Sequence, residues 1–172
     1  VTVTDNENPI FAAAPADVTV ECIGDVPAMT NLTWTDNCDG TGNVAGTDGA
    51  LTGGACGGTI TRTWTYTDAA GNVGTTTQTI TVDDTTNPVF AAAPADVTVE
   101  CIGDVPAMTS LAWTDNCDGA GSVLGSDAAI VGGNCGGTIT RTWTYTDACG
   151  NPASTTQTIT VDDTTNPVFA AA

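Results

Sequence analysis

Apolar and polar residues alternate along most of this chain with a period of two. In the stretch Thr59–Asp68 the alternation places Ile60, Arg62, Trp64 and Tyr66 on one face and threonines on the other. This period is typical of a β-strand with one buried face, and no stretch has the 3.6-residue period of a helix. The same pattern predicts further strands over Val18–Cys22, Leu32–Asp36 and Thr75–Val82, and Ala69–Asn72 predicts a hairpin turn.

The chain also repeats itself almost letter for letter. The twenty residues Phe11–Thr30 recur as Phe90–Thr109, an offset of 79 residues, and the fourteen residues from Cys56 recur from Cys135. Such a tandem copy predicts an array of like domains. We predict the last strand of an upstream repeat at 1–4, full repeats at 5–83 and 84–162, and the start of a downstream repeat at 163–172. The chain is therefore expected to be a window of a longer array.

The strand pattern and the repeat length together predict the fold class. About seven short strands in fewer than about 80 residues, with a turn every 8 to 12, are typical of an immunoglobulin-like β-sandwich. We expect an all-β chain of tandem sandwiches, arranged as beads on a string. Trp34 on the third strand and Trp64 on the sixth are expected to anchor the core. The threonine row is interpreted as an ordinary solvated strand face rather than an ice-binding surface.

Charge narrows the range of partners and functions. Twenty acidic residues face two arginines, with no lysine and no histidine, which gives a net charge of −18. This charge argues against nucleic acid or an anionic membrane as a partner, and it favours bound cations. The sequence also has no phosphate-binding loop and no nucleophile elbow, so we expect no enzymatic activity.

The seven cysteines include no CxxC pair. This pattern favours disulfides and an extracellular location over a zinc site. If the second and sixth strands run in the same direction, the predicted pairs are Cys101–Cys149, Cys117–Cys135 and, in the first repeat, Cys38–Cys56. Cys22 is then a free thiol, because Ala70 stands where the second repeat has Cys149. Four cysteines allow three pairings, so this prediction depends on the assumed strand order.

The segment Asp-Asp-Thr-Thr-Asn-Pro-Val-Phe joins one repeat to the next, at 83–90 and again at 162–169. Its carboxylate, amide and carbonyl oxygens are the ligands that Ca²⁺ prefers, although Asp and Asn are also common in simple turns. We predict structural Ca²⁺ at the junctions. The candidate ligands are Asp83, Asp84, Asn87, Asp162, Asp163 and Asn166, with Asp36, Asp39, Asp104 and Asp147 from neighbouring loops.

The ordered motifs DDTTNPVF, PADVTVEC, TDNCDG, CGGTITRTWTYTDACGN and TQTITVDDTTNP resemble the HYR-like, immunoglobulin-like repeats of very large Bacteroidota surface proteins, including gliding-motility adhesins. The resemblance implies an extracellular, structural role. The junction is also similar to the cadherin linker DxNDNxPxF, which implies a calcium-ligand role for Asp84, Asn87, Asp163 and Asn166. Thr85 and Thr86 depart from that linker. Thr85 and Thr164 resemble bacterial Asp-Thr glycosylation sites, and Asn31 opens an N-glycosylation sequon.

Two functions fit these features. The first is a stalk or spacer segment of a long extracellular adhesin, in which the partners of each repeat are the neighbouring repeats. The second is a subunit of a non-covalent filament, in which Val1–Thr4 completes the sheet of another copy by strand addition. We favour the stalk.

Overall fold

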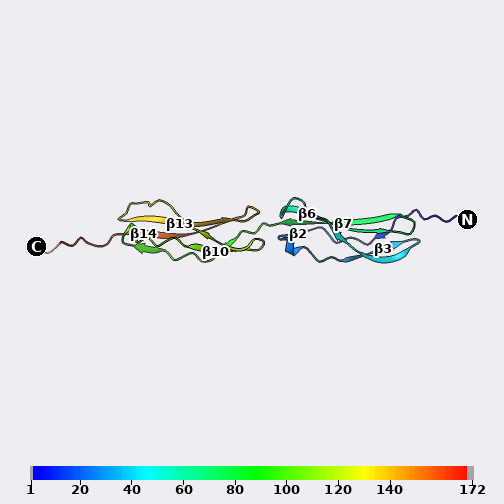
Figure 1. Cartoon of the computed structure of the whole chain (residues 1–172), viewed down its shortest axis with the longest axis horizontal. Coiled ribbons are helices and arrows are strands. Elements are labelled where there is room, and N and C mark those ends of the chain that lie inside the picture. The colour runs from blue at the N-terminus through cyan, green and yellow to red at the C-terminus, as the bar shows by residue number, and fades with distance from the viewer. Residues whose placement is uncertain (1, 170–172) are drawn as a thin grey trace. The chain divides into compact units, whose positions relative to one another are not determined.

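The computed structural model describes residues 2–169, and the chain divides into two compact units, Val1–Thr85 and Thr86–Ala172. Each unit is built from seven strands (Figure 1). In unit 1 the strands are β1 (Ile10–Phe11), β2 (Val18–Val20), β3 (Asn31–Asp36), β4 (Gly40–Ala45), β5 (Thr47–Asp48), β6 (Cys56–Thr67) and β7 (Val73–Asp83). In unit 2 they are β8 (Val89–Phe90), β9 (Val97–Val99), β10 (Ser110–Asp115), β11 (Gly119–Leu124), β12 (Ser126–Asp127), β13 (Gly137–Thr146) and β14 (Pro152–Val161). A short 3₁₀ turn, η1 (Ile23–Asp25) or η2 (Ile102–Asp104), follows the second strand of each unit.

The strands of each unit form one three-stranded and one four-stranded sheet. In unit 1 the orders are β1-β3-β4 and β2-β7-β6-β5, and unit 2 repeats both. The long hairpin of β6 and β7 forms the centre of the four-stranded sheet and is closed by the predicted turn, where the Asp68 amide donates to the Asn72 carbonyl at 3.0 Å. The predicted all-β class with tandem sandwich-like repeats is confirmed.

Two tryptophans join the sheets of unit 1. Trp34 on β3 is 7% exposed and stacks on Tyr66 of β6, with ring centroids 3.6 Å apart. Trp64 is fully buried, and its indole nitrogen donates to the Thr30 carbonyl at 2.8 Å. On the neighbouring strand β4, the residue paired with Trp34 is Gly42, where a Cβ would lie 2.6 Å from the indole ring. The predicted core roles of both tryptophans are confirmed, and Trp113 and Trp143 repeat them in unit 2.

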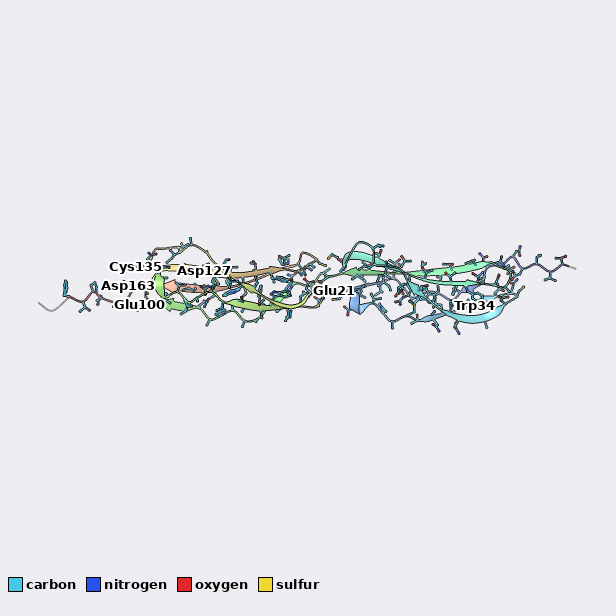
Figure 2. All side chains as sticks on the ribbon, in the orientation of Figure 1. Glu21, Trp34, Glu100, Asp127, Cys135 and Asp163 are labelled. Atoms are coloured by element: carbon cyan, nitrogen blue, oxygen red, sulfur yellow. The ribbon has the colours of Figure 1, made fainter. Side chains whose placement is uncertain are left out.

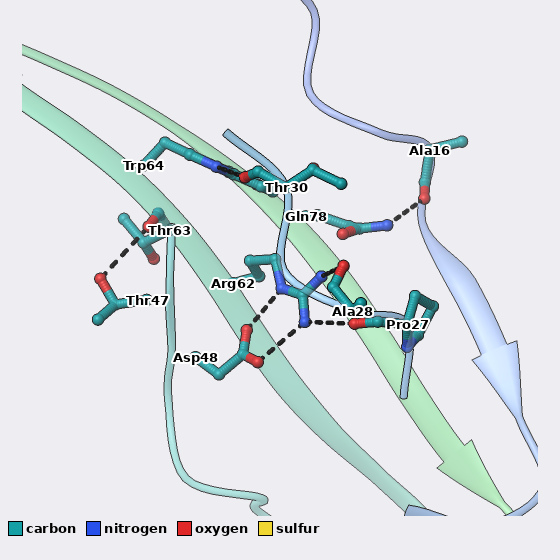
Figure 3. Close-up of polar contacts among 10 residues, drawn as sticks. All are labelled: Ala16, Pro27, Ala28, Thr30, Thr47, Asp48, Arg62, Thr63, Trp64 and Gln78. Atoms are coloured by element: carbon teal, nitrogen blue, oxygen red, sulfur yellow. Dashed lines mark hydrogen bonds and ion pairs between the residues drawn. The ribbon is translucent and has the colours of Figure 1, made fainter. Parts of the chain in front are cut away.

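The alternation of β6 also buries a charge. Ile60, Arg62 and Trp64 point inward and are at most 5% exposed. The Arg62 guanidinium donates to both carboxylate oxygens of Asp48 at 2.6 and 2.9 Å, and to the carbonyls of Pro27 and Ala28 at 2.8 and 3.3 Å. Figure 3 shows this cluster, in which β6, β5 and the segment before β3 meet at one guanidinium. Arg141 makes the same four contacts in unit 2.

The direction of the second strand differs from the prediction. β2 pairs parallel to β7, and β7 pairs antiparallel to β6, so β2 and β6 run in opposite directions. The assumption that the second and sixth strands run the same way is therefore wrong. Each edge of β7 forms hydrogen bonds with one neighbouring strand. β6 occupies one edge, and the short β2 occupies the other in the parallel sense, because the chain crosses from the other sheet to reach it.

The terminal segments form no strand where the structure describes them. Residues 2–4, predicted as the last strand of an upstream repeat, and residues 163–169, predicted as the start of a downstream one, are irregular. Val1 and Ala170–Ala172 lie outside the described residues.

Replacing Arg62 by Met should destabilise unit 1 by about 3 kcal/mol or more, because it leaves Asp48 and two carbonyls without their donor. R141M should destabilise unit 2 by the same amount. Urea unfolding of each variant measures the effect. Thr61→Ala on the exposed face of the same strand is the matched control, with an expected change within about 0.5 kcal/mol. A loss in R62M no larger than in T61A would contradict the role of the buried arginine.

Candidate functional site

The functional groups of each unit gather at its two ends. We call the end of unit 1 that holds Asp5, Asp36, Cys38, Asp39 and Asp68 its N-pole, and the end that holds Glu21, Cys22, Asp25, Cys56 and Asp83 its C-pole. The equivalent ends of unit 2 take the same names. The eleven-residue strand β7 begins beside the first group and ends in the second, so the poles are about 30 Å apart. Figure 2 shows Glu21 and Trp34 toward opposite ends of unit 1.

Three carboxylates meet at the N-pole of unit 1. Asp5, Asp36 and Asp68 each place an oxygen within 4.8 Å of the others. Asp36 Oδ1 accepts the amides of Cys38 and Asp39 at 2.9 and 2.8 Å, whereas its Oδ2 is buried without a hydrogen-bond partner. Three like charges at this distance repel one another unless a cation or a proton joins them. The residues therefore fit a hard divalent cation, which takes carboxylate oxygens as ligands.

An open pocket of about 240 Å³ adjoins this carboxylate group. Its lining consists of Glu7, Asn8, Ile10, Thr35, Asp36 and Asn37. Five of these six side chains carry an oxygen, so the approach to Asp36 is polar and negatively charged. The sequence prediction included Asp36 and missed Asp5 and Asp68, although Asp5 precedes the first strand as Asp84 does in the second repeat.

Asp68 closes the β6–β7 hairpin and stays ionised inside it. Burial favours its neutral form, but the Asn72 side chain donates to Oδ2 and the Asn72 amide to Oδ1, both at 2.7 Å, and these bonds hold the pKa of Asp68 below its ordinary value. The equivalent Asp147 is 6% exposed, and its pKa is lowered by the same kind of contact with Asn151. This carboxylate can serve as an anionic ligand while it also holds the turn.

Asp39 has a structural partner set of its own. Its Oδ2 accepts the Ala69 amide at 2.9 Å and the Tyr66 hydroxyl at 3.3 Å, which ties the loop after β3 to the β6–β7 turn. Desolvation and the nearby Asp39 carboxylate raise the pKa of Tyr66. Asp118 makes the same contacts to Ala148 and Tyr145 in unit 2.

At the C-pole a glutamate holds the segment that leaves the last strand. Glu21 accepts the amide of Thr85 at 2.8 Å and its hydroxyl at 3.0 Å, and Glu100 accepts the same two groups of Thr164 at 2.8 and 2.7 Å. These hydrogen bonds lower the pKa of Glu100. The predicted glycosylation sites Thr85 and Thr164 are exposed, but their hydroxyls already donate to a carboxylate, and Asn31 is exposed at the start of β3.

The predicted calcium ligands do not form one group. Within unit 1, Asp36 and Asp39 lie at the N-pole, whereas Asp83 ends β7 at the C-pole. Within unit 2, Asp104 accepts the amide of Cys101 just beyond β9, near the start of β13. Asp147 instead closes the turn after the end of β13. Asp36 and Asp39 therefore lie away from the junction segment that follows β7, and Asp104 lies away from the segment that precedes β8, because the assumed strand direction was wrong. The calcium-ligand roles stay predictions. Asp84 is buried, and Asn87, Asp162, Asp163 and Asn166 are exposed.

All three predicted disulfides are wrong. Cys22, Cys56, Cys117 and Cys149 are bonded, and Cys38, Cys101 and Cys135 are free thiols. The predicted pairs Cys38–Cys56, Cys117–Cys135 and Cys101–Cys149 each contain a free thiol, and the predicted free thiol Cys22 is bonded. The wrong strand direction explains the failure, since each predicted pair joins a cysteine at one end of its unit to a cysteine at the other end.

The registers identify the bonded partners. Val20 and Gly58 both pair with Val82, so Cys22 and Cys56 leave the sheet on either side of the end of β7. In unit 2, Asp118 binds the Ala148 amide at 2.9 Å, which brings Cys117 beside Cys149. We infer the bonds Cys22–Cys56 at the C-pole of unit 1 and Cys117–Cys149 at the N-pole of unit 2. Loops of this length stabilise a fold by about 3 to 4 kcal/mol in the chain-entropy model.

Residues 10–82 and 89–161 each match the model of one protein family, described as "HYR-like domain with 4 cysteines". The second match contains four cysteines, Cys101, Cys117, Cys135 and Cys149, and the first contains three, with Ala70 in the fourth position. No curated protein matches the chain. Across residues 2–169 no helix has the length and apolar character needed to cross a membrane.

The lowered pKa of Asp68 predicts a loss of stability in acid. Its contribution is fully present above the unfolded pKa of about 4 and disappears as the pH falls through the lower folded value. Asp68→Asn should therefore be less stable than the wild type at pH 7, and the difference should shrink below about pH 4. The free energies of unfolding of both proteins across this range measure it, since the comparison cancels the general relief of charge repulsion. A difference that is constant with pH would contradict the assignment.

The position of Ala70 predicts a disulfide that can be installed. Ala70→Cys should bond to Cys38, because Cys117 and Cys149 are bonded at the equivalent positions of unit 2. Unit 1 should gain about 3 to 4 kcal/mol. Thiol titration and thermal unfolding, with and without reductant, measure the bond and its effect. Ala69→Cys is the matched control and should leave Cys38 titratable; a free Cys38 in A70C would contradict the pairing.

Proposed function

The chain belongs to the family of HYR-like domains with four cysteines, and we propose that it is a spacer segment of an extracellular stalk, in which each domain adds its length to a surface adhesin. The tandem domains and their intra-repeat disulfides fit an extracellular, structural repeat. The adhesin assignment and the Bacteroidota, gliding-motility type follow from the resemblance of the repeat motifs alone.

The observation that supports the proposal is where the chain enters and leaves each unit. In unit 1 the first strand β1 pairs with Thr35 and Trp34 next to the N-pole, and the last strand β7 ends at the C-pole. Unit 2 has the same arrangement, from β8 to β14. A domain whose two ends lie at opposite poles contributes its full length to an array, which is what a spacer requires.

The last strand is also built to carry tension along the chain. β7 lies between β2 and β6 and bonds to β6 over almost its whole length. A pull along β7 loads these hydrogen bonds in parallel, so they resist together rather than one at a time. The bonded cysteines Cys22 and Cys56 flank its end, and Glu21 holds Thr85 just beyond it. The covalent bond and the hydrogen bonds thus reinforce the point where force enters the domain.

Calcium is the second part of the proposal. Asp5, Asp36 and Asp68 supply three carboxylates within 4.8 Å, and Asp36 Oδ2 is buried with no hydrogen-bond partner. The equivalent Asp115 Oδ2 in unit 2 is also buried with no hydrogen-bond partner. An oxygen that is desolvated and unpaired costs about 1 to 3 kcal/mol unless a cation binds it. In a chain of net charge −18, Ca²⁺ at this pole would remove the repulsion and fix the segment before β1 against the loop after β3.

Adding millimolar Ca²⁺ to chelator-treated protein should raise its melting temperature, and EDTA should reverse the rise. Asp36→Asn should weaken the calcium response of unit 1 at least tenfold in apparent affinity, which is a loss of about 1.4 kcal/mol. Asp25→Asn removes the same charge from the C-pole and should leave the response unchanged. Equal responses in D36N and D25N, or none in the wild type, would reject the site while leaving the spacer function intact.

The size of the natural polypeptide tests the spacer itself. An antibody to this segment should detect a very large polypeptide on a denaturing, reducing gel of the source cells. A band near the 17.1 kDa of this chain would instead support the alternative, a subunit of a non-covalent filament assembled by strand addition.

A further inference from the structure

The two C-poles have the same architecture but different sulfur chemistry. Cys22 and Cys56 of unit 1 are bonded, whereas the equivalent Cys101 and Cys135 of unit 2 are free thiols. The sequence around the first member of each pair is identical from Phe11 to Thr30 and from Phe90 to Thr109. The difference in bonding therefore arises around the second cysteine of each pair, Cys56 or Cys135.

The sheet register brings Cys101 and Cys135 together. Val99 and Gly137 both pair with Val161, from opposite sides of β14, as Val20 and Gly58 do with Val82. Cys101 lies two residues after Val99 and Cys135 two residues before Gly137. Figure 2 places Cys135 with Glu100 and Asp163 at one end of unit 2. The Cys135 thiol also contributes to the raised pKa of Cys101, after desolvation and the carboxylates of Asp104, Asp163 and Glu100, so the two sulfurs are close enough to interact.

The strand that follows the second cysteine begins later in unit 2. β6 begins at Cys56, which pairs with Asp83, whereas β13 begins two residues further on, at Gly137. The preceding loop differs at four positions: Gly49 against Ala128, Leu51 against Ile130, Thr52 against Val131, and Ala55 against Asn134. The Thr52 hydroxyl donates to the Thr59 carbonyl at 3.1 Å, and Val131 is 73% exposed and has no such donor. Unit 1 thus shows the closed form of this pole and unit 2 the open form.

We propose that Cys101 and Cys135 are a redox-closed staple: an oxidant joins them in a third disulfide of this chain, which ties β9 to β13 across the end of β14. Cys38 then remains the one thiol among the seven cysteines, since its partner position is Ala70. The staple would close around the strand end that Glu100 holds through Thr164.

The redox step is an ordinary thiol–disulfide exchange. The thiolate of one cysteine attacks a low-molecular-weight disulfide such as oxidised glutathione, which forms a mixed disulfide and releases one glutathione thiolate. The second cysteine then displaces the other glutathione. Two thiols lose two protons and two electrons, one S–S bond forms, and the glutathione disulfide is reduced to two thiols. The acids around Cys101 disfavour its thiolate, so the exchange should be faster at higher pH.

Alkylation of the native chain with N-ethylmaleimide, before and after oxidised glutathione, tests the proposal. Cleavage before aspartate puts Cys101, Cys117, Cys135 and Cys149 in four different peptides. The expected result after oxidation is that Cys38 alone is alkylated or carries glutathione, with a linked peptide pair that contains Cys101 and Cys135. Persistent alkylation of Cys38, Cys101 and Cys135, glutathione left on both Cys101 and Cys135, or a link from Cys101 to Cys117 or Cys149 would overturn it.

Two variants separate the staple from a general effect of oxidation. In C101S, Cys135 should be alkylated before oxidation and either alkylated or joined to glutathione after it, without a link to another cysteine, and oxidation should no longer raise the melting temperature of unit 2. C22S, the matched control, should expose Cys56 and lower the stability of unit 1 without changing the bond in unit 2. An oxidation-dependent rise in melting temperature that survives in C101S would contradict a role for this pair.

Discussion

The fold of each unit depends on one buried cation. Arg62 is 3% exposed and is satisfied by Asp48 and by two carbonyls of the segment before β3. A guanidinium stripped of water is tolerated only where every donor finds an acceptor, so these partners must reach it together. The side chain therefore fixes β5 and the segment before β3 relative to β6. Its contact with Asp48 also lowers the pKa of that carboxyl, so the pair stays charged at neutral pH.

This constraint explains how so small an apolar core suffices. The buried aliphatic cluster of unit 1 consists of Ile60, Ile80 and Val82, packed against partly buried neighbours, and the rest of the interior is aromatic or polar. Gln78 is one of the buried polar side chains. Its amide nitrogen donates to the Ala16 carbonyl at 2.7 Å and holds the segment before β2. In a domain of this size, polar ties and a disulfide supply the specificity that a larger apolar core gives elsewhere.

The sequence predicts the parts of this structure that follow from local periodicity. The alternation in Thr59–Asp68 predicts the strand, its buried face and the Trp64 anchor. It also places Arg62 on the buried face, and this placement was the signal in the sequence for a buried ion pair. The pairing of Cys22 with Cys56 is not local. It depends on whether β2 lies parallel or antiparallel to its neighbour, and a three-residue strand carries no periodic signal of its direction. The error in one strand direction displaced all three predicted disulfides and the loop carboxylates Asp36, Asp39 and Asp104.

The two repeats differ in which pole carries a disulfide. Most of the 79-residue unit is copied unchanged, yet unit 1 keeps the C-pole bond and lacks the N-pole one, and unit 2 has the reverse. In an array each junction joins the C-pole of one repeat to the N-pole of the next along the chain. A change at a single cysteine position, such as Ala70 against Cys149, therefore alters the covalent support on one side of a junction and leaves the sheets intact. Copying preserves the buried arginine and the long hairpin, which set the fold. In the spacer that we propose, a cysteine substitution at a pole would change the mechanical resistance of one repeat and leave its sheets intact.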